Sequence, residues 1–406
     1  MSNSVNVDSA AWLRSQWSNP TDIFTILLII GGDIVQCALA QLSGGYLTSV
    51  VFSFGWVSYA VSAIMSAFGE GRLMPPPDNP CLLINANNGY ARDNKSWILS
   101  RILRDFEFWM HEDLEKIEAE ELAKLRKVDP KARIGLRVAV YDAKSITGKP
   151  SSDWLYWIGF FTIAAQLALA AIPWGLWGEW LTFFVTGSGT LLAFASGALP
   201  QWNEEKTVNR TLDTPKDVAL TQGNGAHDVL LIIGSENDPG MDLEALASPL
   251  RELKHKLSTR IYSVLLSIGW VALLISVAGY QGHTWCLVGV GIIGMLHNVA
   301  VAGAPRKPQA YGIDIEYKQA YVAKKVMQVL LAVEADYPGR GMSLLPTLFP
   351  GNLSSQEENY WSYAVRRRKA WKESKRGEKF EMWDMPRWED MQRGIVMPAT
   401  GRYVSQ

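Results

Sequence analysis

Six long apolar runs constrain the fold of this chain of 406 residues more than any other feature. A helix needs about 20 predominantly apolar residues to cross a bilayer, and each run reaches that length. The sequence therefore predicts an α-helical polytopic membrane protein with six transmembrane helices. The runs are residues 22–43, 46–68, 154–173, 180–200, 260–280 and 284–303.

Short connections pair these runs into three transmembrane hairpins. The three hairpin tips contain no Lys or Arg, whereas 14 lie in the first long loop, seven in residues 201–260 and 17 after residue 303. Basic loops remain on the cytoplasmic side of a membrane, so we expect both termini and both long loops in the cytosol. The expected segments are an N-terminal segment 1–21, hairpins 22–68, 154–200 and 260–303, loops 69–153 and 201–259, and a C-terminal tail 304–406.

The long loops and the tail contain the patterns of a small cytosolic α/β portion. Apolar and polar residues alternate over 136–141 and 311–317, and residues 229–233 form a continuous apolar run, all typical of strands. Apolar residues at helical spacing predict helices over 96–127 and near 316–335. We expect the three strands to join in one sheet. The helix over 96–127 would either pack on this core or lie on the bilayer.

An acidic residue in the middle of the first run, Asp33, is the main candidate for a functional group. A carboxylate at bilayer depth is costly, and such residues usually mark functional sites and face other helices. The alternative is a structural hydrogen bond between helices, often worth only about 0.6 kcal/mol. Packing of the helices would bring other polar side chains near Asp33, and the candidate intramembrane polar site comprises Asp33, Gln36, Gln166, His297 and Asn298.

A glycine motif in the last run allows two interpretations. Gly289, Gly291 and Gly294 match G-x-G-x-x-G, and Asp314 follows about 20 residues later, as in a dinucleotide site. That site requires a preceding strand and a soluble helix, whereas these glycines lie inside an apolar run that ends at Pro305. Close helix packing through small residues explains the glycines better.

No other motif in the sequence predicts a cofactor. Walker, H-E-x-x-H, G-x-S-x-G and CxxC patterns are absent, and the three cysteines are too scattered for a zinc site or a disulfide framework. We therefore expect no cofactor, no metal and no nucleic-acid partner. The expected partners are the lipid bilayer, a lipophilic small molecule and anionic lipid. The anionic lipid would contact a basic cluster in the tail: Arg366, Arg367, Arg368 and Lys369. The alternative is that these residues lie on a charged helix exposed to solvent.

Three segments carry a resemblance to a known group of proteins. They are Gly31-Gly32-Asp33, Gly71-Arg72-Leu73-Met74-Pro75-Pro76-Pro77 and Gly89-Tyr90-Ala91-Arg92-Asp93-Asn94-Lys95-Ser96-Trp97. With them the chain resembles uncharacterised multi-span membrane proteins of filamentous fungi, over most of residues 18–300. The resemblance implies a fungal membrane protein, encoded beside secondary-metabolite genes. It supplies no catalytic residues.

The sequence leaves three classes of function open. The leading hypothesis is an accessory membrane protein that handles or organises a lipophilic small molecule, because no soluble catalytic signature accompanies the large cytosolic portion. The second is a proton-coupled transporter or channel that uses Asp33. The third is a membrane-embedded enzyme, such as a cyclase, with Asp33 as its general acid.

Overall fold

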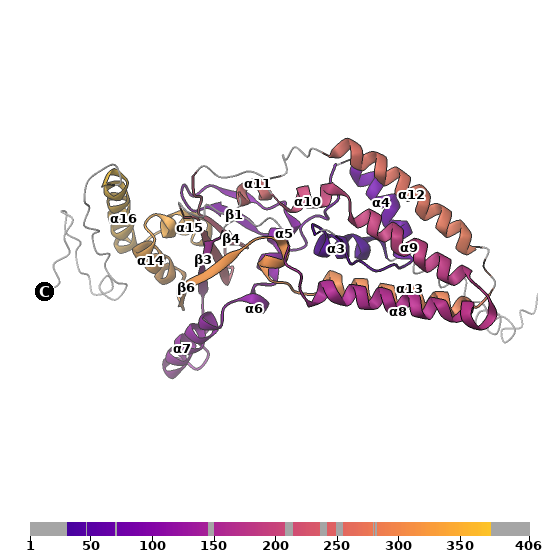
Figure 1. Ribbon diagram of the computed structural model, residues 1–406. Coiled ribbons are helices and arrows are strands. Elements are labelled where there is room, and N and C mark those ends of the chain that lie inside the picture. Colours follow the sequence, from indigo (N-terminus) through magenta and orange to yellow (C-terminus); the bar gives the residue numbers. More distant parts are fainter. Residues whose placement is uncertain are drawn as a thin grey trace, which may run out of the picture.

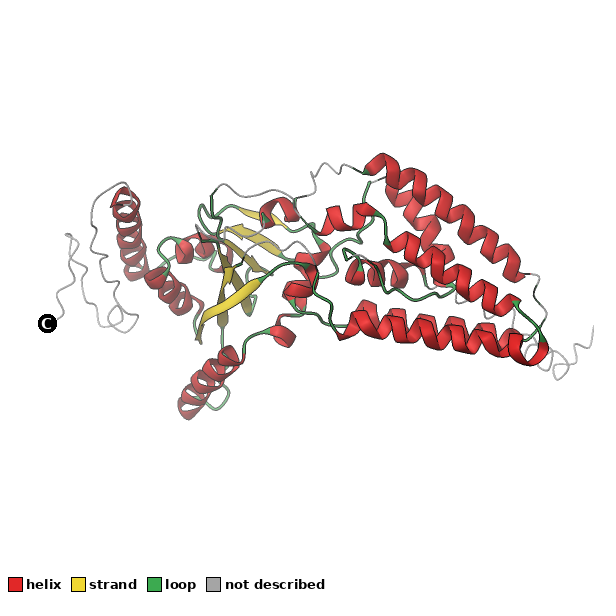
Figure 2. Ribbon diagram, in the orientation of Figure 1, coloured by secondary structure: helices red, strands yellow, loops and turns green. Residues whose placement is uncertain are grey.

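The protein consists of a bundle of long helices at one end and a sheet flanked by helices at the other (Figure 1). The computed structural model describes residues 31–45, 47–69, 71–144, 150–207, 214–235, 242–248, 255–278, 280 and 282–374. One buried apolar core continues from the bundle to the near face of the sheet, so the two parts pack as one body. Figure 2 shows which segments of the chain are helices, strands and loops.

Three helices in the described part are long and apolar enough to cross a membrane: α8 (Trp154–Trp177), residues Leu257–Ala278 of α12 (Lys256–Ala278), and α13 (Thr284–Gly303). A fourth span arises if α9 (Leu181–Gly197) and the short α10 (Pro200–Lys206), which meet at a 45° bend, are counted together. Their outer surfaces expose large apolar side chains such as Phe161, Leu191 and Leu296. The last four predicted runs thus form the bundle, whereas six transmembrane helices are not confirmed.

The first two predicted runs differ from expectation. The first contains α3 (Gly32–Leu42), and its part before residue 31 lies outside the described residues. The second is not one helix, because the described residues 47–54 are non-helical and only α4 (Gly55–Phe68) follows them. Fourteen helical residues rise about 21 Å, less than the bilayer core of about 30 Å. Thr, Ser and Val residues in 47–54 have low helix propensity, which favours this break.

The stretch from Gly44 to Gly71 enters the bundle and leaves it again at the same end. A Cβ added to Gly44 would lie 3.1 Å from the Lys206 side chain, and the Gln201 amide donates a hydrogen bond to the Gly71 carbonyl (2.9 Å). Both side chains belong to α10. The chain therefore enters the bundle as the non-helical segment and returns to the sheet end as α4.

The sheet has six strands in the order β2-β1-β4-β5-β3-β6, and only β3 and β5 pair in parallel. The predicted strands correspond to β3, β5 and the start of β6, and their union in one sheet is confirmed. Sequence reasoning missed β1, β2 and β4, and the expected helix near 316–335 is wrong before residue 324, because β6 occupies that stretch. The strands are β1 (Leu82–Asn85), β2 (Ala91–Asp93), β3 (Leu136–Ala143), β4 (Val218–Thr221), β5 (Asp228–Ile233) and β6 (Ile315–Ala323).

Helices cover both faces of the sheet. Leu83, Leu220 and Leu230 share the core that includes α5 (Trp97–Arg104) and α6 (Phe106–Trp109). Ile84 and Leu231 face the opposite core, formed with α14 (Val326–Asp336), α15 (Arg340–Leu348) and α16 (Ser355–Ser374). The short α11 (Leu243–Ala247) and the 3₁₀ helix η1 (Pro308–Tyr311) lie in the connections.

The single helix predicted over 96–127 is three helices. Breaks at Asp105 and between Met110 and His111 separate α5, α6 and α7 (Glu112–Val128). Apolar residues of α5 and α6 are buried against the sheet, so these two helices pack on the core. Only Leu114 of α7 is buried, and Figure 1 shows this helix projecting from the sheet.

Candidate functional site

The non-helical residues 47–54, here named the inserted segment, run deep between the long helices. Thr48 packs against Gly197, and Phe52 packs against Gly189, eight residues earlier on α9. Eight helical residues rise about 12 Å, and four residues of extended chain span about 13–14 Å. Residues 48–52 are therefore nearly fully extended, and Phe52 lies beside the middle of α9.

Glycines of three helices provide the space for the inserted segment. A Cβ on Gly159 of α8 would overlap the Ser49 carbonyl oxygen, and one on Gly189 would overlap the Phe52 ring. A Cβ on Gly294 of α13 would overlap the Phe52 carbonyl oxygen. Gly294 belongs to the G-x-G-x-x-G motif, so close packing through small residues is confirmed there. A strand does not precede these glycines, which lie within α13.

Two buried amide side chains hydrogen-bond the backbone of the inserted segment. Gln166 donates to the carbonyls of Phe52 (2.9 Å) and Val290 (2.7 Å), and Asn298 donates to the Val51 carbonyl (3.0 Å). A buried backbone carbonyl outside helices and strands needs such a partner, because an unpaired buried polar group is costly. The contacts give Gln166 and Asn298 a structural role.

The five residues of the predicted intramembrane polar site do not form one cluster. His297 pairs with Thr162 (3.2 Å), near Gln166 and Asn298. Gln36 instead donates to the Leu73 carbonyl (2.8 Å), and the Asp33 side chain is exposed in the described part of the structure. Asp33 thus does not face the other described helices as expected, because the rotation of α3 is set by its packing against α4 and α13. A role for Asp33 in proton transfer stays a prediction.

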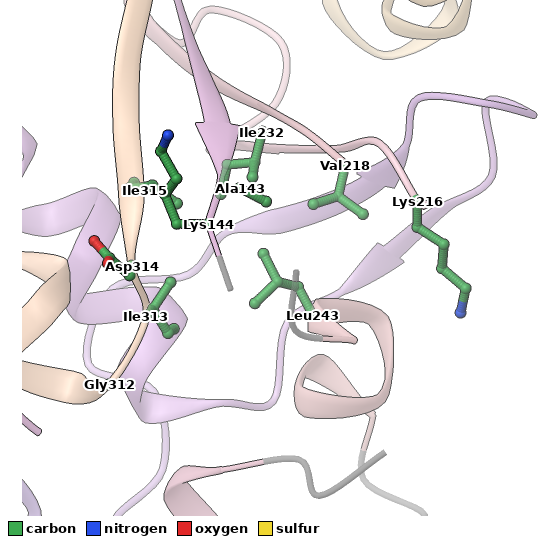
Figure 3. Close-up of a pocket in the computed structure, with 10 residues that line it drawn as sticks. All are labelled: Ala143, Lys144, Lys216, Val218, Ile232, Leu243, Gly312, Ile313, Asp314 and Ile315. Atoms are coloured by element: carbon green, nitrogen blue, oxygen red, sulfur yellow. The ribbon is translucent and has the colours of Figure 1, made fainter. Parts of the chain in front are cut away.

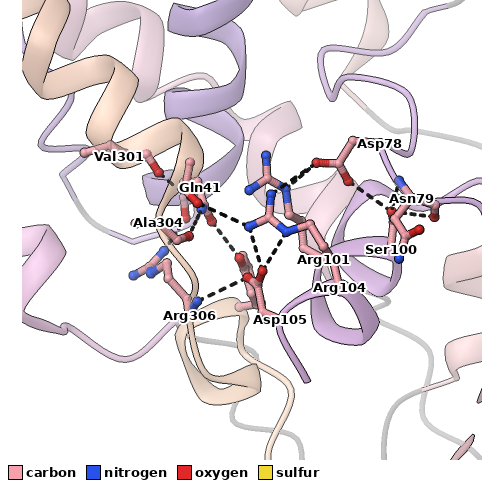
Figure 4. Close-up of polar contacts among 12 residues, drawn as sticks. Gln41, Asp78, Asn79, Ser100, Arg101, Arg104, Asp105, Val301, Ala304 and Arg306 are labelled. Atoms are coloured by element: carbon pink, nitrogen blue, oxygen red, sulfur yellow. Dashed lines mark hydrogen bonds and ion pairs between the residues drawn. The ribbon is translucent and has the colours of Figure 1, made fainter. Parts of the chain in front are cut away.

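A second polar cluster lies where the bundle meets the sheet, around the buried Gln41 near the end of α3 (Figure 4). Its amide donates to the carbonyls of Val301 (3.2 Å) and Ala304 (2.8 Å), which close the end of α13. Its Oε1 accepts from the Tyr311 hydroxyl (2.6 Å). Burial raises the pKa of the Tyr311 hydroxyl above its usual value, so this group remains a donor. Gln41 therefore ties α3 to α13 and to η1.

Two cations hydrogen-bond the carboxyl end of α3. The Lys206 ammonium donates to the Gln41 carbonyl (3.0 Å) and to the Ser43 carbonyl. Arg306 donates to the same Gln41 carbonyl and to both oxygens of Asp153 (2.7 and 3.0 Å). The carboxyl end of a helix carries partial negative charge and favours cations.

Further ion pairs extend this cluster towards the sheet. Asp105 accepts from the Arg306 backbone amide (3.2 Å) and from the Arg104 side chain (2.6 Å). Asp78 then pairs with Arg104 (3.5 Å) and Arg101 (2.7 Å), and Figure 4 shows these contacts in sequence. The junction between bundle and sheet is thus held by a continuous polar network.

A cavity of about 430 Å³, here named the junction cavity, opens beside these cations. Its size lies within the usual range for small-molecule sites, about 300–1,000 Å³. Apolar and polar side chains both line it, and they come from four separate stretches of chain. The lining residues are Leu42, Gly44, Gly45, Pro150, Ser151, Ser152, Tyr156, Gly197, Ala198, Leu199, Pro200, Asn203 and Arg306.

Sequence reasoning missed the junction cavity. The only local signals were the Gly44-Gly45 pair at a hairpin tip and basic residues directly after two apolar runs, Lys206 and Arg306. Neither signal reveals a cavity, because its walls come from stretches of chain spread over residues 42–306.

A second pocket lies at the ends of β3 and β5, where parallel strands often place a ligand site (Figure 3). Its volume is about 20 Å³, which holds about one water molecule. Lys144 and Lys216 at its rim pair with Glu316 (2.5 Å) and Asp242 (3.1 Å). Asp314 also lies here, on the sheet side of the molecule. The junction cavity is the better candidate for a ligand site.

The basic cluster of the tail is partly used inside the protein. Arg367 is buried and donates to the Ala335 carbonyl at the end of α14 (3.0 Å), and Arg368 donates to the Asn87 carbonyl. Arg366 and Lys369 are exposed. These residues lie on α16, at the end of the molecule away from the bundle (Figure 1). Contact of this cluster with anionic lipid stays a prediction. Two of its four side chains face solvent and could make that contact.

Comparisons with protein-family models, with curated proteins and with solved structures found no match to this chain. The resemblance to fungal multi-span proteins therefore stays a prediction. Within the described residues, no three His, Cys, Asp or Glu side chains are grouped so that they could hold a metal ion.

Proposed function

We propose that the protein lies in a membrane through its helical bundle and binds the polar end of a lipophilic small molecule in the junction cavity. The observation that carries the proposal is the position of this cavity. It lies where the apolar bundle meets the sheet, and its lining includes Tyr156 of α8 and Ala198 after α9 together with Asn203 and Arg306. An amphiphilic ligand matches such a lining, because its tail and its head group need different surroundings.

The proposed topology places α8, α9, α12 and α13 across the bilayer and the sheet in the cytosol. The length and apolar surface of these helices support the crossings, and the basic loops support the orientation. The inserted segment and α4 would form a re-entrant hairpin, since both of their ends contact α10. Non-helical backbone is tolerated at membrane depth only where protein surrounds it or where it lines a cavity.

The orientation predicts the modification state of Asn352. This exposed residue begins the sequon Asn352-Leu353-Ser354 between α15 and α16. Glycosylation requires exposure to the secretory lumen, so we expect no glycosidase-sensitive mass shift after expression in a eukaryotic host. As a positive control, a linker with a sequon is inserted after Gly178 at the tip between α8 and α9, where a shift is expected. A shift at Asn352 would contradict the orientation.

Filling the junction cavity should abolish ligand binding. A Cβ on Gly45 meets only the Leu47 carbonyl oxygen, at 3.8 Å, so Gly45→Trp is expected to fold with its ring in the cavity. Gly187→Trp is the matched control, because this glycine of α9 has nothing within 4 Å and does not line the cavity. Binding of dioleoylphosphatidate and dioleoylglycerol is measured by native mass spectrometry of the purified protein.

We expect the native protein and Gly187→Trp to bind at least one of these two amphiphiles saturably. Gly45→Trp should lose about tenfold or more in affinity, because a large side chain occupies the space of the head group. Equal binding by Gly45→Trp, or no saturable binding by the native protein, would refute the proposed function.

A further inference from the structure

The hydrogen-bond donors and the charge around the junction cavity specify the head group of its ligand. We propose that the cavity selects amphiphiles whose polar end is an anion, a phosphate or a carboxylate. This inference rests on the function proposed above and goes beyond it, since binding of a lipophilic molecule does not by itself require charge.

Arg306 supplies donors that the protein does not use. A guanidinium has five N–H groups. Two of those in Arg306 bind Asp153 and a third binds the Gln41 carbonyl, so two remain without a partner among the described residues. Arg306 lines the cavity and is itself 3% exposed, so an anion placed there would meet a fixed and largely desolvated guanidinium. Hydrogen bonds between charged partners are about twice as strong as neutral ones.

Neutral donors surround the same space. Ser151, Ser152 and Asn203, whose side chains carry hydroxyl and amide donors, line the cavity together with Arg306. Hydrogen bonds from these three side chains into the described structure are not observed, so they are available to a ligand. The described lining contains no Asp or Glu. The nearby Asp153 carboxylate already binds Arg306 through both oxygens.

A buried amine lies behind the cavity wall. Lys206 is fully buried, and a Cβ on Gly44, which lines the cavity, would lie 3.1 Å from its Cδ. The acceptors of its ammonium are the carbonyls of Gln41 and Ser43, which carry only partial charge. A buried ammonium without a carboxylate is costly. An anion in the adjacent cavity would offset that cost and stabilise the charged form of Lys206.

The test replaces one neutral donor with a carboxylate of nearly the same shape. Asn203→Asp places a carboxylate in the cavity, whereas Asn88→Asp makes the same change at an exposed residue between β1 and β2. Both variants and the native protein are placed in phosphatidylcholine nanodiscs. Binding of dioleoylphosphatidate is compared with that of dioleoylglycerol, and oleate is compared with oleyl alcohol. Inorganic phosphate is added as a competitor without a tail.

We expect the native protein and Asn88→Asp to prefer the anionic member of at least one pair about tenfold or more. Asn203→Asp should lower that preference about tenfold, because the two negative charges repel at short range. Equal binding of the anionic and neutral members would overturn this inference and leave the proposed function standing. If neither binds, the proposed function fails as well. Displacement by inorganic phosphate at equal concentration would show a site for free anions and would refute an amphiphilic ligand.

Discussion

Gly294→Ala is expected to destabilise the bundle by about 3 kcal/mol or more. The added methyl group would overlap the carbonyl oxygen of Phe52, and backbone atoms on both sides leave no flexible group that can yield. Overpacking a core costs about 1–3 kcal/mol when side chains can move, and occasionally more. A shift of Phe52 would also disturb its hydrogen bond from Gln166 (2.9 Å). Thermal unfolding of the detergent-solubilised protein measures the loss.

Two other glycines provide matched controls for Gly294→Ala. Gly289 lies on the same helix, and its Cβ would meet only the end of the flexible Leu169 side chain, at 3.2 Å. Gly187 has nothing within 4 Å, so Gly187→Ala should raise stability by up to about 1 kcal/mol through helix propensity. If Gly294→Ala unfolds at the same temperature as Gly289→Ala, the inserted segment does not pass Gly294 as described.

Gln41→Leu is expected to cost about 2–4 kcal/mol. Leucine has a similar volume, but it leaves the buried Tyr311 hydroxyl without an acceptor and the Ala304 carbonyl without this donor. Each buried polar group that loses its partner costs about 1–3 kcal/mol. The effect should appear as a lower unfolding temperature for the whole protein, because Gln41 joins the bundle to the segment that leads into the sheet.

A double-mutant cycle separates this hydrogen bond from simple repacking. Tyr311→Phe removes the hydroxyl, so in the presence of Gln41→Leu it should cost much less than in the native protein. We expect a coupling of about 1 kcal/mol or more between the two residues, within the range found for contacting pairs. Additive losses would show that the contact between Tyr311 and Gln41 (2.6 Å) contributes nothing to stability.

Local patterns were sufficient to predict several elements. Three predicted elements are present in the structure: the helices α8 and α13 and the strand β5. Each was recognisable because its apolar pattern involves only residues close together in the sequence. β6 was predicted only at its beginning, and the polar residues Lys318 and Gln319 obscured the rest. This strand lies at an edge of the sheet, where one side is less buried and polar residues are tolerated.

The inserted segment shows why the remainder was not predictable from sequence. An apolar run has the same composition whether it forms a helix or a buried extended chain. The deciding partners of residues 47–54 are Gln166, Asn298 and the glycines of α8, α9 and α13, which lie more than 100 residues later. The placement of Asp33 failed for a related reason, because periodicity defines a stripe along a helix and neighbouring helices decide where it faces.

The candidate site was hidden by the same separation in sequence. Lys206 and Arg306 are ordinary basic residues that follow apolar runs. Their convergence on the end of α3 depends on how three helices meet at the junction. A local sequence pattern does not determine how these helices pack together. The junction cavity could therefore be found only in the three-dimensional structure.

The position of the inserted segment also constrains the order of events during biosynthesis. Phe52 is translated 242 residues before Gly294. At about 5–20 residues per second, its final surroundings are completed roughly 12–50 s after it leaves the ribosome. In the membrane topology proposed above, residues 46–68 during that interval form an apolar run long enough to cross the bilayer. The newly made chain must therefore hold this run in another arrangement first, and folding is completed only when the later helices close around it.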